Sequence, residues 1–213
     1  MAEGTVFVVD DDPAVRKSLE LLMRSVGLPV QTYRTAQEFL DRHGPEQAGC
    51  LVLDVRMPGM SGPELQRHLK ETGADLPTII ITGHGDVPIA VRAMKDGALE
   101  FLQKPFSTQL LLEHIRVALD RDVERREVLA RRSSVAARLA ALTERERQVM
   151  ELVVSGKISK EVATALGISK KTVDVHRARV MQKLQVQSLP ELVELVLTHK
   201  ADRDAPRPMR RPS

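Results

Sequence analysis

The sequence of 213 residues contains a single cysteine, Cys50. One cysteine excludes an intrachain disulfide, and its place in an apolar run indicates a core residue instead of a reactive thiol. The six histidines are scattered and show no metal-ligand spacing. No apolar run reaches about 18 residues, and no charged-then-apolar signal segment begins the chain. These absences predict a cytoplasmic protein that is not inserted in a membrane.

The residues present indicate a globular chain with an uneven distribution of charge. Hydrophobic residues make up 42% and charged residues 29%, and the length allows one large domain or two modest ones. Residues 1–120 carry 12 Lys and Arg against 17 Asp and Glu, whereas residues 121–213 carry 20 against 12. We therefore expect two domains with different partners, and the basic one favours a polyanion such as nucleic acid.

Short apolar runs alternate with helical patterns over the first 120 residues. The runs cover 5–9, 29–33, 50–54, 77–82 and 100–103, and the helical patterns start at Pro13 and then cover 36–43, 63–71, 87–95 and 108–119. This alternation predicts an α/β fold, a doubly wound parallel sheet of five strands with helices on both faces and right-handed crossovers.

Polar residues follow the predicted strands, so they are expected to meet at one edge of the sheet. Clustered carboxylates repel one another, and a hard cation such as Mg²⁺ would resolve that conflict. A hydroxyl and an ammonium at the same edge suit the oxygens of a phosphoryl group, for which Asp54 would be the nucleophile. Two simpler interpretations stay open: Asp54 caps the following turn, or Lys104 pairs with the acidic cluster. The residues are Asp10, Asp11, Asp12, Asp54, Thr82 and Lys104.

These motifs resemble the receiver domain of two-component response regulators, a CheY-like fold. The resemblance covers about residues 4–120 and rests on Val-Val-Asp-Asp-Asp at 8–12, Met-Pro-Gly-Met-Ser-Gly at 57–62, Thr-Gly-His-Gly at 82–85 and Lys-Pro-Phe at 104–106. It implies that Asp54 is the phosphoacceptor and that Mg²⁺ or Mn²⁺ is bound by Asp11 directly, by Asp10 through water, by Asp54, and by the main-chain carbonyl of Arg56. It also implies that Thr82 and Lys104 sense the phosphoryl group and that the Lys104-Pro105 bond is cis.

The same resemblance implies a conformational switch and a dimer. Phe101 occupies the position of an aromatic residue that swings inward when Thr82 moves onto the phosphate, although a plain half-buried sheet residue fits equally well. The loop 82–88, with glycine at 83 and 85, is suited to rearrangement. This part of the chain looks closest to the FixJ-like branch, which dimerises through its fourth helix, fifth strand and fifth helix. The expected dimer face contains Val91, Lys95, Leu111 and Ile115.

Residues 121–140 form a charged, helix-favouring linker without Pro or Gly. We expect them to extend the preceding helix as a solvated rod, with a break near Ser133 and Ser134. The basic residues could instead bind DNA, but the interleaved Asp and Glu favour a connector.

Residues 141–200 show a helix-turn-helix pattern. A capping box begins at Thr143, and Ser159 and Ser169 are expected to cap helices over 160–166 and 170–184 on either side of the turn at Gly167. The stretch is similar to the LuxR-type DNA-binding domain, which implies base contacts and phosphate contacts from the third of its four helices. The residues 189–199 resemble that family's dimerisation helix, and a disordered tail is expected over 201–213. The expected DNA-binding residues are Lys170, Lys171, Thr172, Asp174, Val175, His176, Arg177, Ala178, Arg179 and Lys183.

Together these features predict a response regulator transcription factor. Its expected partners are a cognate sensor histidine kinase, promoter DNA, a second copy after phosphorylation, and RNA polymerase. It would accept a phosphoryl group and slowly autodephosphorylate without acting as a turnover enzyme. A phosphatase of the haloacid-dehalogenase kind is an alternative, but such enzymes place a second Asp where this chain has Arg56. A constitutive DNA-binding protein whose receiver only dimerises is another.

Overall fold

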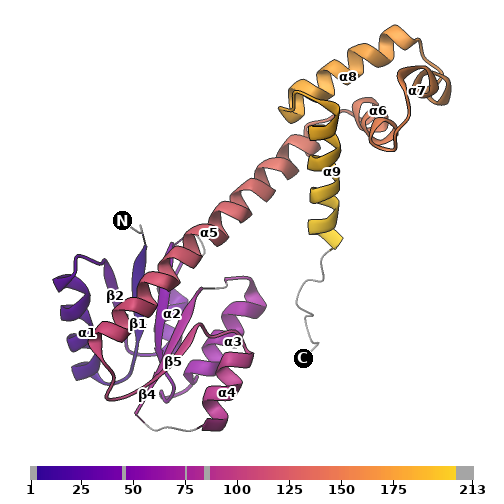
Figure 1. Cartoon of the computed structure of the whole chain (residues 1–213). Helices are drawn as coiled ribbons and strands as arrows, with labels where there is room; N and C mark the ends of the chain where they lie inside the picture. The colour runs from indigo at the N-terminus through magenta and orange to yellow at the C-terminus, as the bar shows by residue number, and fades with distance from the viewer. Residues whose placement is uncertain (1–3, 45–46, 75, 84–86, 205–213) are drawn as a thin grey trace. The chain divides into compact units, whose positions relative to one another are not determined.

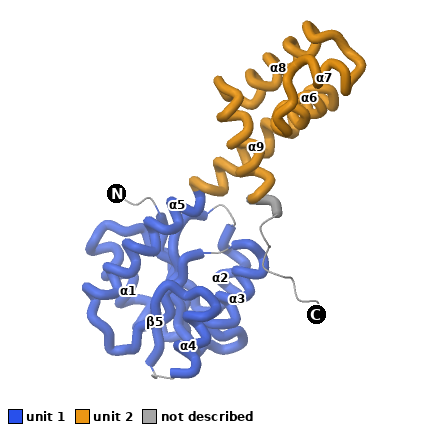
Figure 2. The backbone as a smooth tube through the Cα atoms, turned by 45° about the vertical axis from the view of Figure 1, so that its right-hand side comes forward, with its two compact units in different colours: residues 1–126, 212 blue, residues 127–211, 213 orange. Residues whose placement is uncertain are grey.

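The computed structural model describes residues 4–44, 47–74, 76–83 and 87–204. The chain divides into two compact units, residues 1–126 and the residues from Glu127 onward, coloured blue and orange in Figure 2. The first unit therefore includes the first residues of the predicted linker 121–140. None of the helices over the described residues combines the length and the apolar composition of a membrane span.

The first unit is built on a parallel sheet that the described residues form with five strands in the order β2-β1-β3-β4-β5. Strands and helices alternate along the chain, as Figure 1 shows and as the sequence predicts. The strands are β1 (Thr5–Val9), β2 (Val30–Tyr33), β3 (Gly49–Asp54), β4 (Thr78–Thr82) and β5 (Glu100–Gln103), and the helices are α1 (Pro13–Ser25), α2 (Ala36–Arg42), α3 (Gly62–Thr72), α4 (Val87–Lys95) and α5 (Thr108–Ala140).

Hydrophobic side chains fill both faces of this sheet. One cluster joins alternate residues of the central strands to Leu19 and Met23 of α1 and to Leu111 and Ile115 of α5. On the opposite face, α2, α3 and α4 cover the residues that point the other way. Because both faces are covered, all six residues of β3 are buried, as is usual in parallel sheets. Cys50 is one of them, which confirms it as a core residue.

Helix α5 differs from the expected solvated rod with a break. It is one continuous helix through Ser133 and Ser134, because residues 121–140 contain no Pro or Gly to interrupt it. Residues 121–140 are also not solvated throughout, because Asp122 is 1% exposed and accepts a hydrogen bond from the first residue of β3. The residues after Arg126 belong to the second unit.

The second unit contains four further helices in its described part: α6 (Glu144–Val154), α7 (Ser159–Leu166), α8 (Lys170–Leu184) and α9 (Leu189–Asp204). The predicted capping box is present, because the Thr143 hydroxyl accepts a hydrogen bond from the Glu146 amide and the Glu146 carboxylate accepts one from the Thr143 amide. Gly167 adopts a left-handed conformation (φ +63°) between α7 and α8, and Ser169 caps α8. The helix-turn-helix prediction is confirmed.

Two boundaries differ from the expectation. Helix α7 begins at Ser159, so Ser159 is its first residue and not its cap. The N-cap residue is Ile158, whose amide donates a hydrogen bond to the carboxylate of Glu161. Helix α9 continues to Asp204, so residues 201–204 are helical and not part of a disordered tail. The rest of the predicted tail, residues 205–213, and His84, Gly85 and Asp86 of the predicted loop lie outside the described residues.

Candidate functional site

Two carboxylates and one ammonium group meet at the carboxyl edge of the sheet. The Nζ of Lys104, just after β5, lies 2.8 Å from Oδ2 of Asp10 and 2.8 Å from Oδ1 of Asp54. Asp10 directly follows β1 and Asp54 ends the neighbouring β3, and the two residues are 1% and 7% exposed. The parallel sheet therefore brings together residues far apart in the sequence, as predicted from the strand ends.

Asp10 is held by its surroundings as well as by Lys104. Its Oδ1 accepts a hydrogen bond of 2.9 Å from the Asp12 amide, and Arg16 donates one of 2.7 Å to its main-chain carbonyl. Asp12 itself caps α1 by accepting a hydrogen bond from the Ala14 amide. Burial raises the pKa of Asp10 despite the opposing effect of Lys104 and the Asp12 amide. A buried carboxyl of this kind favours a nearby cation.

Lys104 supplies such a cation in this structure. Burial is the largest single influence on the Lys104 pKa and lowers it, but hydrogen bonds to Asp10 and Asp54 and the charges of both carboxylates raise it by more. The pKa therefore lies above its ordinary value, and the ammonium stays charged at neutral pH. The Lys104-Pro105 peptide bond is cis, as the resemblance implied.

The turn after β3 is shaped around Asp54. The second carboxylate oxygen of Asp54 accepts a hydrogen bond of 2.8 Å from the Arg56 amide, and the Gly62 amide donates to the Val55 carbonyl. A Cβ at Gly62 would lie 2.2 Å from the main-chain oxygen of Asp54. The start of α3 can pack against the end of β3 only with glycine at this position.

The donor groups fit a hard divalent cation. Asp10 and Asp54 already direct one oxygen each at a single point, which the Lys104 ammonium occupies. Asp11 is exposed and, with Arg56, lines an adjacent cavity of about 620 Å³. Within the described ranges, no three carboxylate, imidazole or thiolate groups are already gathered as a metal cluster. Mg²⁺ needs few protein ligands because it retains several waters, so this set suits it.

The predicted switch residues lie on the neighbouring strands. Thr82 ends β4, is 2% exposed, and its carbonyl accepts a hydrogen bond of 2.7 Å from the Lys104 amide. Phe101 of β5 is half-buried and packs against the cluster that contains Ile80 and Ala93. Their strands pair directly, with Phe101 opposite Ile80, two residues before Thr82.

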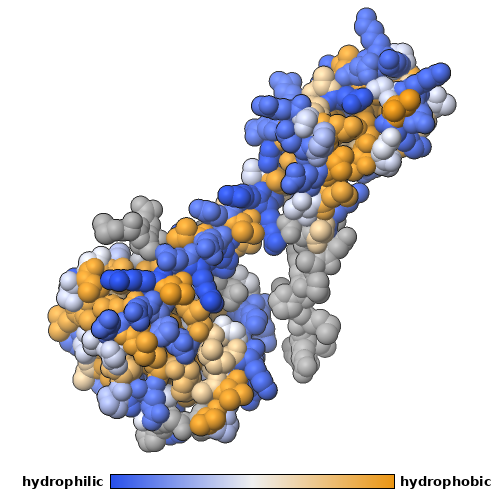
Figure 3. Space-filling view, viewed as in Figure 1, coloured by the Kyte–Doolittle hydropathy of each residue, from blue (hydrophilic) through white to orange (hydrophobic). Residues whose placement is uncertain are grey.

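The predicted dimer face is only partly at the surface. Val91 is 48% exposed and Lys95 is exposed, both on α4, and Figure 3 shows apolar surface over this helix. Leu111 and Ile115 are 0% exposed, so their assignment to the dimer face was wrong. The apolar stripe of α5 that contains them packs on the sheet of its own unit, because a helix buries its most apolar side against the core.

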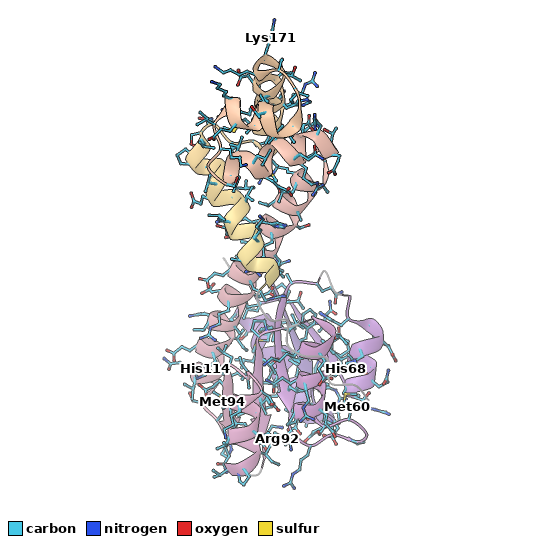
Figure 4. All side chains as sticks on the ribbon, turned by 90° about the vertical axis from the view of Figure 1, so that its right-hand side faces the viewer. Met60, His68, Arg92, Met94, His114 and Lys171 are labelled. Carbon is cyan, nitrogen blue, oxygen red and sulfur yellow. The ribbon has the colours of Figure 1, made fainter. Side chains whose placement is uncertain are left out.

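Most predicted DNA-binding residues lie on the accessible side of α8. Figure 4 shows Lys171 projecting from the unit into solvent at the start of this helix. Thr172 is half-buried near the cap, where its hydroxyl lies 2.8 Å from the Ser169 hydroxyl. The exposed residues are Lys170, Lys171, Asp174, Val175, Ala178 and Arg179. An exposed helix face with basic residues around a few neutral and acidic ones matches a recognition helix.

Other predicted contacts are engaged within the unit. Arg177 donates a hydrogen bond of 2.8 Å to the Ser159 hydroxyl. Lys183 lies 2.7 Å from Oε2 of Glu146 and donates to the Ala141 carbonyl. His176 is half-buried, and its Nδ1 has no hydrogen-bond partner within the described residues. Arg177 and Lys183 therefore join α8 to α7 and α6 of its own domain.

Three supporting residues were not singled out from the sequence. Arg16 donates to the Asp10 carbonyl, Gly62 allows the turn after Asp54, and Glu146 pairs with Lys183. Gly62 belongs to the motif at 57–62 and Glu146 to the capping box, so the sequence indicated their local roles. Nothing in the sequence indicated their tertiary partners, because pairing between elements depends on packing, which spacing along the chain does not specify.

Comparisons with known proteins agree with this geometry. The family model of the response regulator receiver domain matches residues 6–116, and that of the luxR family of bacterial regulatory proteins matches residues 140–196. The transcriptional regulatory protein FixJ of Azorhizobium caulinodans is 50% identical over 192 residues, which are 90% of this chain and 91% of that protein.

Solved structures give the same result. The response regulator StyR is 50% identical, with a TM-score of 0.86 over 92% of this chain and 100% of that chain. Full-length FixJ from B. japonicum is 44% identical, with a TM-score of 0.57 over 94% of this chain and 98% of that chain. The chain therefore belongs to the response regulators, within the FixJ-type transcription factors that join a receiver domain to a LuxR-type DNA-binding domain and are regulated by phosphorylation.

Proposed function

We propose that Asp54 accepts a phosphoryl group from a cognate sensor histidine kinase, and that this modification controls promoter binding by the second unit. One observation carries the proposal: the oxygens of Asp10 and Asp54 converge on the Nζ of Lys104 at the carboxyl edge of the sheet. A nucleophile, a charge-neutralising group and a second carboxylate at one point are the parts that phosphoryl transfer needs.

The chemistry uses an in-line displacement. An oxygen of the Asp54 carboxylate bonds to phosphorus while the phosphorus–nitrogen bond of the donor breaks, and its electron pair stays on the imidazole nitrogen. Asp10, Asp11 and Asp54, with the Arg56 carbonyl, would hold Mg²⁺ or Mn²⁺, which when bound neutralises charge on the transferred phosphoryl oxygens. The product is an acyl phosphate whose slow hydrolysis, without turnover of an external substrate, resets the protein.

The acyl phosphate changes the partners of the surrounding residues. Lys104 is released from Asp54 to pair with a phosphoryl oxygen, and the Thr82 hydroxyl donates a hydrogen bond to another. Movement of Thr82 vacates space that Phe101 of the paired strand enters. The altered surface around α4, which includes Val91 and Lys95, then pairs with a second copy.

The second unit binds promoter DNA through α8. Asp174, Val175 and Ala178 face base edges, while Lys170, Lys171 and Arg179 contact phosphates. A dimer presents two such helices and so prefers two half-sites. Thr172, His176, Arg177 and Lys183 lie at the border of this surface and position α8. We infer RNA polymerase as a further partner and the cytoplasm as the location, since regulators of this family act on transcription.

The proposal is tested by phosphorylation with labelled acetyl phosphate and Mg²⁺, followed by DNA binding. Asp54→Asn should lose the label and the phosphorylation-dependent gain in DNA affinity. Asp120→Asn, an exposed acidic residue of α5, should retain both and serves as the matched control. Label retained by Asp54→Asn would refute the assignment. Steady turnover of a phosphomonoester by the wild-type chain would instead support a phosphatase.

A further inference from the structure

Asp122 is a buried carboxylate in a stretch that the sequence describes as a solvated linker. It is 1% exposed, and its Oδ2 accepts a hydrogen bond of 2.9 Å from the main-chain amide of Gly49. Its Oδ1 lies 2.7 Å from a terminal guanidinium nitrogen of Arg125, and its Oδ2 lies 3.1 Å from Nε of Arg126. Burying a charge is costly unless the charge is paired and hydrogen-bonded, and these contacts stabilise Asp122 in its buried position.

Gly49 is the first residue of β3, the strand that ends at Asp54. Its φ is +155°, and a Cβ there would lie 1.9 Å from the Thr5 main-chain oxygen. The backbone of Gly49 is therefore pressed against β1, and its amide is directed to Asp122. The phosphoacceptor strand is thus anchored to α5 at the end opposite to the phosphoacceptor.

The same helix has a second anchor within the other unit. Arg138 donates a hydrogen bond of 2.7 Å to the main-chain oxygen of Leu184, the last residue of α8. A cationic side chain at the carboxyl end of a helix is favoured by the unpaired carbonyls there. Lys183 reinforces this junction by donating to the Ala141 carbonyl, just beyond the end of α5. The recognition helix is therefore tied to the end of α5.

We propose that Asp122 and Arg138 are positioning residues of the phosphorylation switch. Asp122 fixes α5 to the phosphoacceptor strand, Arg138 fixes the same uninterrupted helix to the recognition helix, and α5 transmits rotation or displacement between the two hydrogen bonds. The inference rests on the proposed function, because it concerns how a change at Asp54 reaches α8. The route along β3 and α5 would act in addition to the proposed change in the surface around α4.

The first test compares DNA affinity with and without acetyl phosphate for full-length variants, using a duplex that the phosphorylated wild type selects from a randomised pool. The wild-type ratio should lie in the range of about 5- to 150-fold that allosteric couplings usually show. In Asp122→Ala and Arg138→Ala the ratio should fall to within about twofold of one, while intact-mass measurements show wild-type phosphorylation of Asp54.

Matched controls remove equal charges from exposed positions of the same helix. Glu124→Ala and Arg131→Ala should keep the wild-type ratio, since both residues are exposed. Asp122→Asn should keep most of it, because the amide oxygen can still accept the Gly49 hydrogen bond. A purely structural role would lower the unfolding temperature of Asp122→Ala but leave the ratio of the folded protein unchanged, and that outcome would overturn the proposal.

A second test does not depend on substituting a buried residue. Two alanines inserted after Ser133 rotate the two anchors by about 200° relative to each other, whereas seven rotate them to within about 20° of two full turns. The two-residue insertion should bring the ratio of DNA affinities with and without acetyl phosphate close to one. The seven-residue insertion should preserve much of the wild-type ratio. Equal switching in both would show that α5 is a passive tether. A wild-type ratio near one would refute the proposed function, whereas switching in wild type and Asp122→Ala alike would refute this inference alone.

Discussion

The Nζ of Lys104 lies 2.8 Å from the Oδ1 of Asp54, the residue that we propose as the phosphoacceptor. The ammonium neutralises two buried carboxylates that would otherwise repel each other. Under the proposed function, Lys104 would exchange Asp54 for a phosphoryl oxygen as its partner. Pairing with acidic residues, which the structure shows, and sensing phosphate, which we propose, would then describe Lys104 in two states.

Lys104→Met should bind Mg²⁺ more tightly than the wild type, because the competing ammonium is removed while the carboxylates of Asp10 and Asp54 remain. Without Mg²⁺ the variant should lose on the order of 2 kcal/mol of stability, less than a fully buried pair, since the Lys104 side chain is 23% exposed. Thermal unfolding over a Mg²⁺ titration measures both effects. Lys17→Met, on exposed α1 surface, is the control. An unchanged or weaker Mg²⁺ affinity would contradict competition at this site.

Gly62→Ala should destabilise the first unit by about 1–3 kcal/mol, because the added Cβ would lie 2.2 Å from the Asp54 main-chain oxygen. Displacement of Asp54 should also slow its phosphorylation. Denaturant unfolding and the rate of labelling measure the two effects. Gly44→Ala, where the nearest atom would be 3.9 Å away, should be close to neutral. Equal behaviour of the two variants would show that the turn tolerates a side chain.

The stability of the second unit should depend on Glu146 at acidic pH. Lys183 and then the Thr143 amide hold the pKa of Glu146 down, from an ordinary value of 4.5 to about 2. A lowered folded-state pKa contributes stability that is complete above 4.5 and is lost as the pH falls towards 2. Unfolding of Glu146→Gln should therefore depend less on pH in this window. Glu144→Gln, exposed in the same helical turn, should follow the wild type; equal slopes for all three would refute the ion pair's role.

Lys171→Ala should weaken binding to all DNA sequences alike and reduce the slope of log affinity against log salt by about 1, as expected for one lost phosphate contact. The unfolding temperature should not change, because Lys171 projects into solvent. Fluorescence anisotropy at several salt concentrations gives the slope. A change in base preference would show that Lys171 reads sequence.

Arg177→Ala should lower stability by about 1 kcal/mol through the loss of the hydrogen bond to the Ser159 hydroxyl. Ser159→Ala removes the same hydrogen bond without changing the charge. It therefore separates two possible roles of Arg177, the positioning of α8 and a direct phosphate contact. If Arg177 only positions α8, both variants should lose similar DNA affinity. A much larger loss for Arg177→Ala would assign it a direct phosphate contact.

Val91→Glu should prevent phosphorylation-dependent dimerisation, because it places a charge on exposed apolar surface of α4. Leu111→Ala should instead destabilise the first unit by about 2–5 kcal/mol, since Leu111 is a core residue. Sedimentation of the phosphorylated protein and denaturant unfolding distinguish the effects. Val26→Glu, at 42% exposure beyond α1, is the control for an added charge. Dimerisation by Val91→Glu at wild-type strength would place the interface elsewhere.

Local sequence patterns were enough to predict the alternation of strands and helices, the acidic edge of the sheet and the helix-turn-helix. These features depend on local periodicity, capping residues and the rule that parallel strands end on one side. Asp54, Asp10 and Lys104 could be placed at one edge for this reason, although they are distant in the chain. The motifs at 8–12 and 57–62 added the expected roles.

Packing between elements, in contrast, sets which side of a helix is buried and which charged side chains are paired. Leu111 and Ile115 read as apolar helix positions, and only packing on the sheet removed them from the surface. Arg177 and Lys183 looked like their exposed neighbours until Ser159 and Glu146 were found beside them. Asp122 seemed solvated because its partner, the Gly49 amide, lies in a distant strand. Such pairings depend on how the elements pack against one another, and this packing is not specified by spacing along the chain.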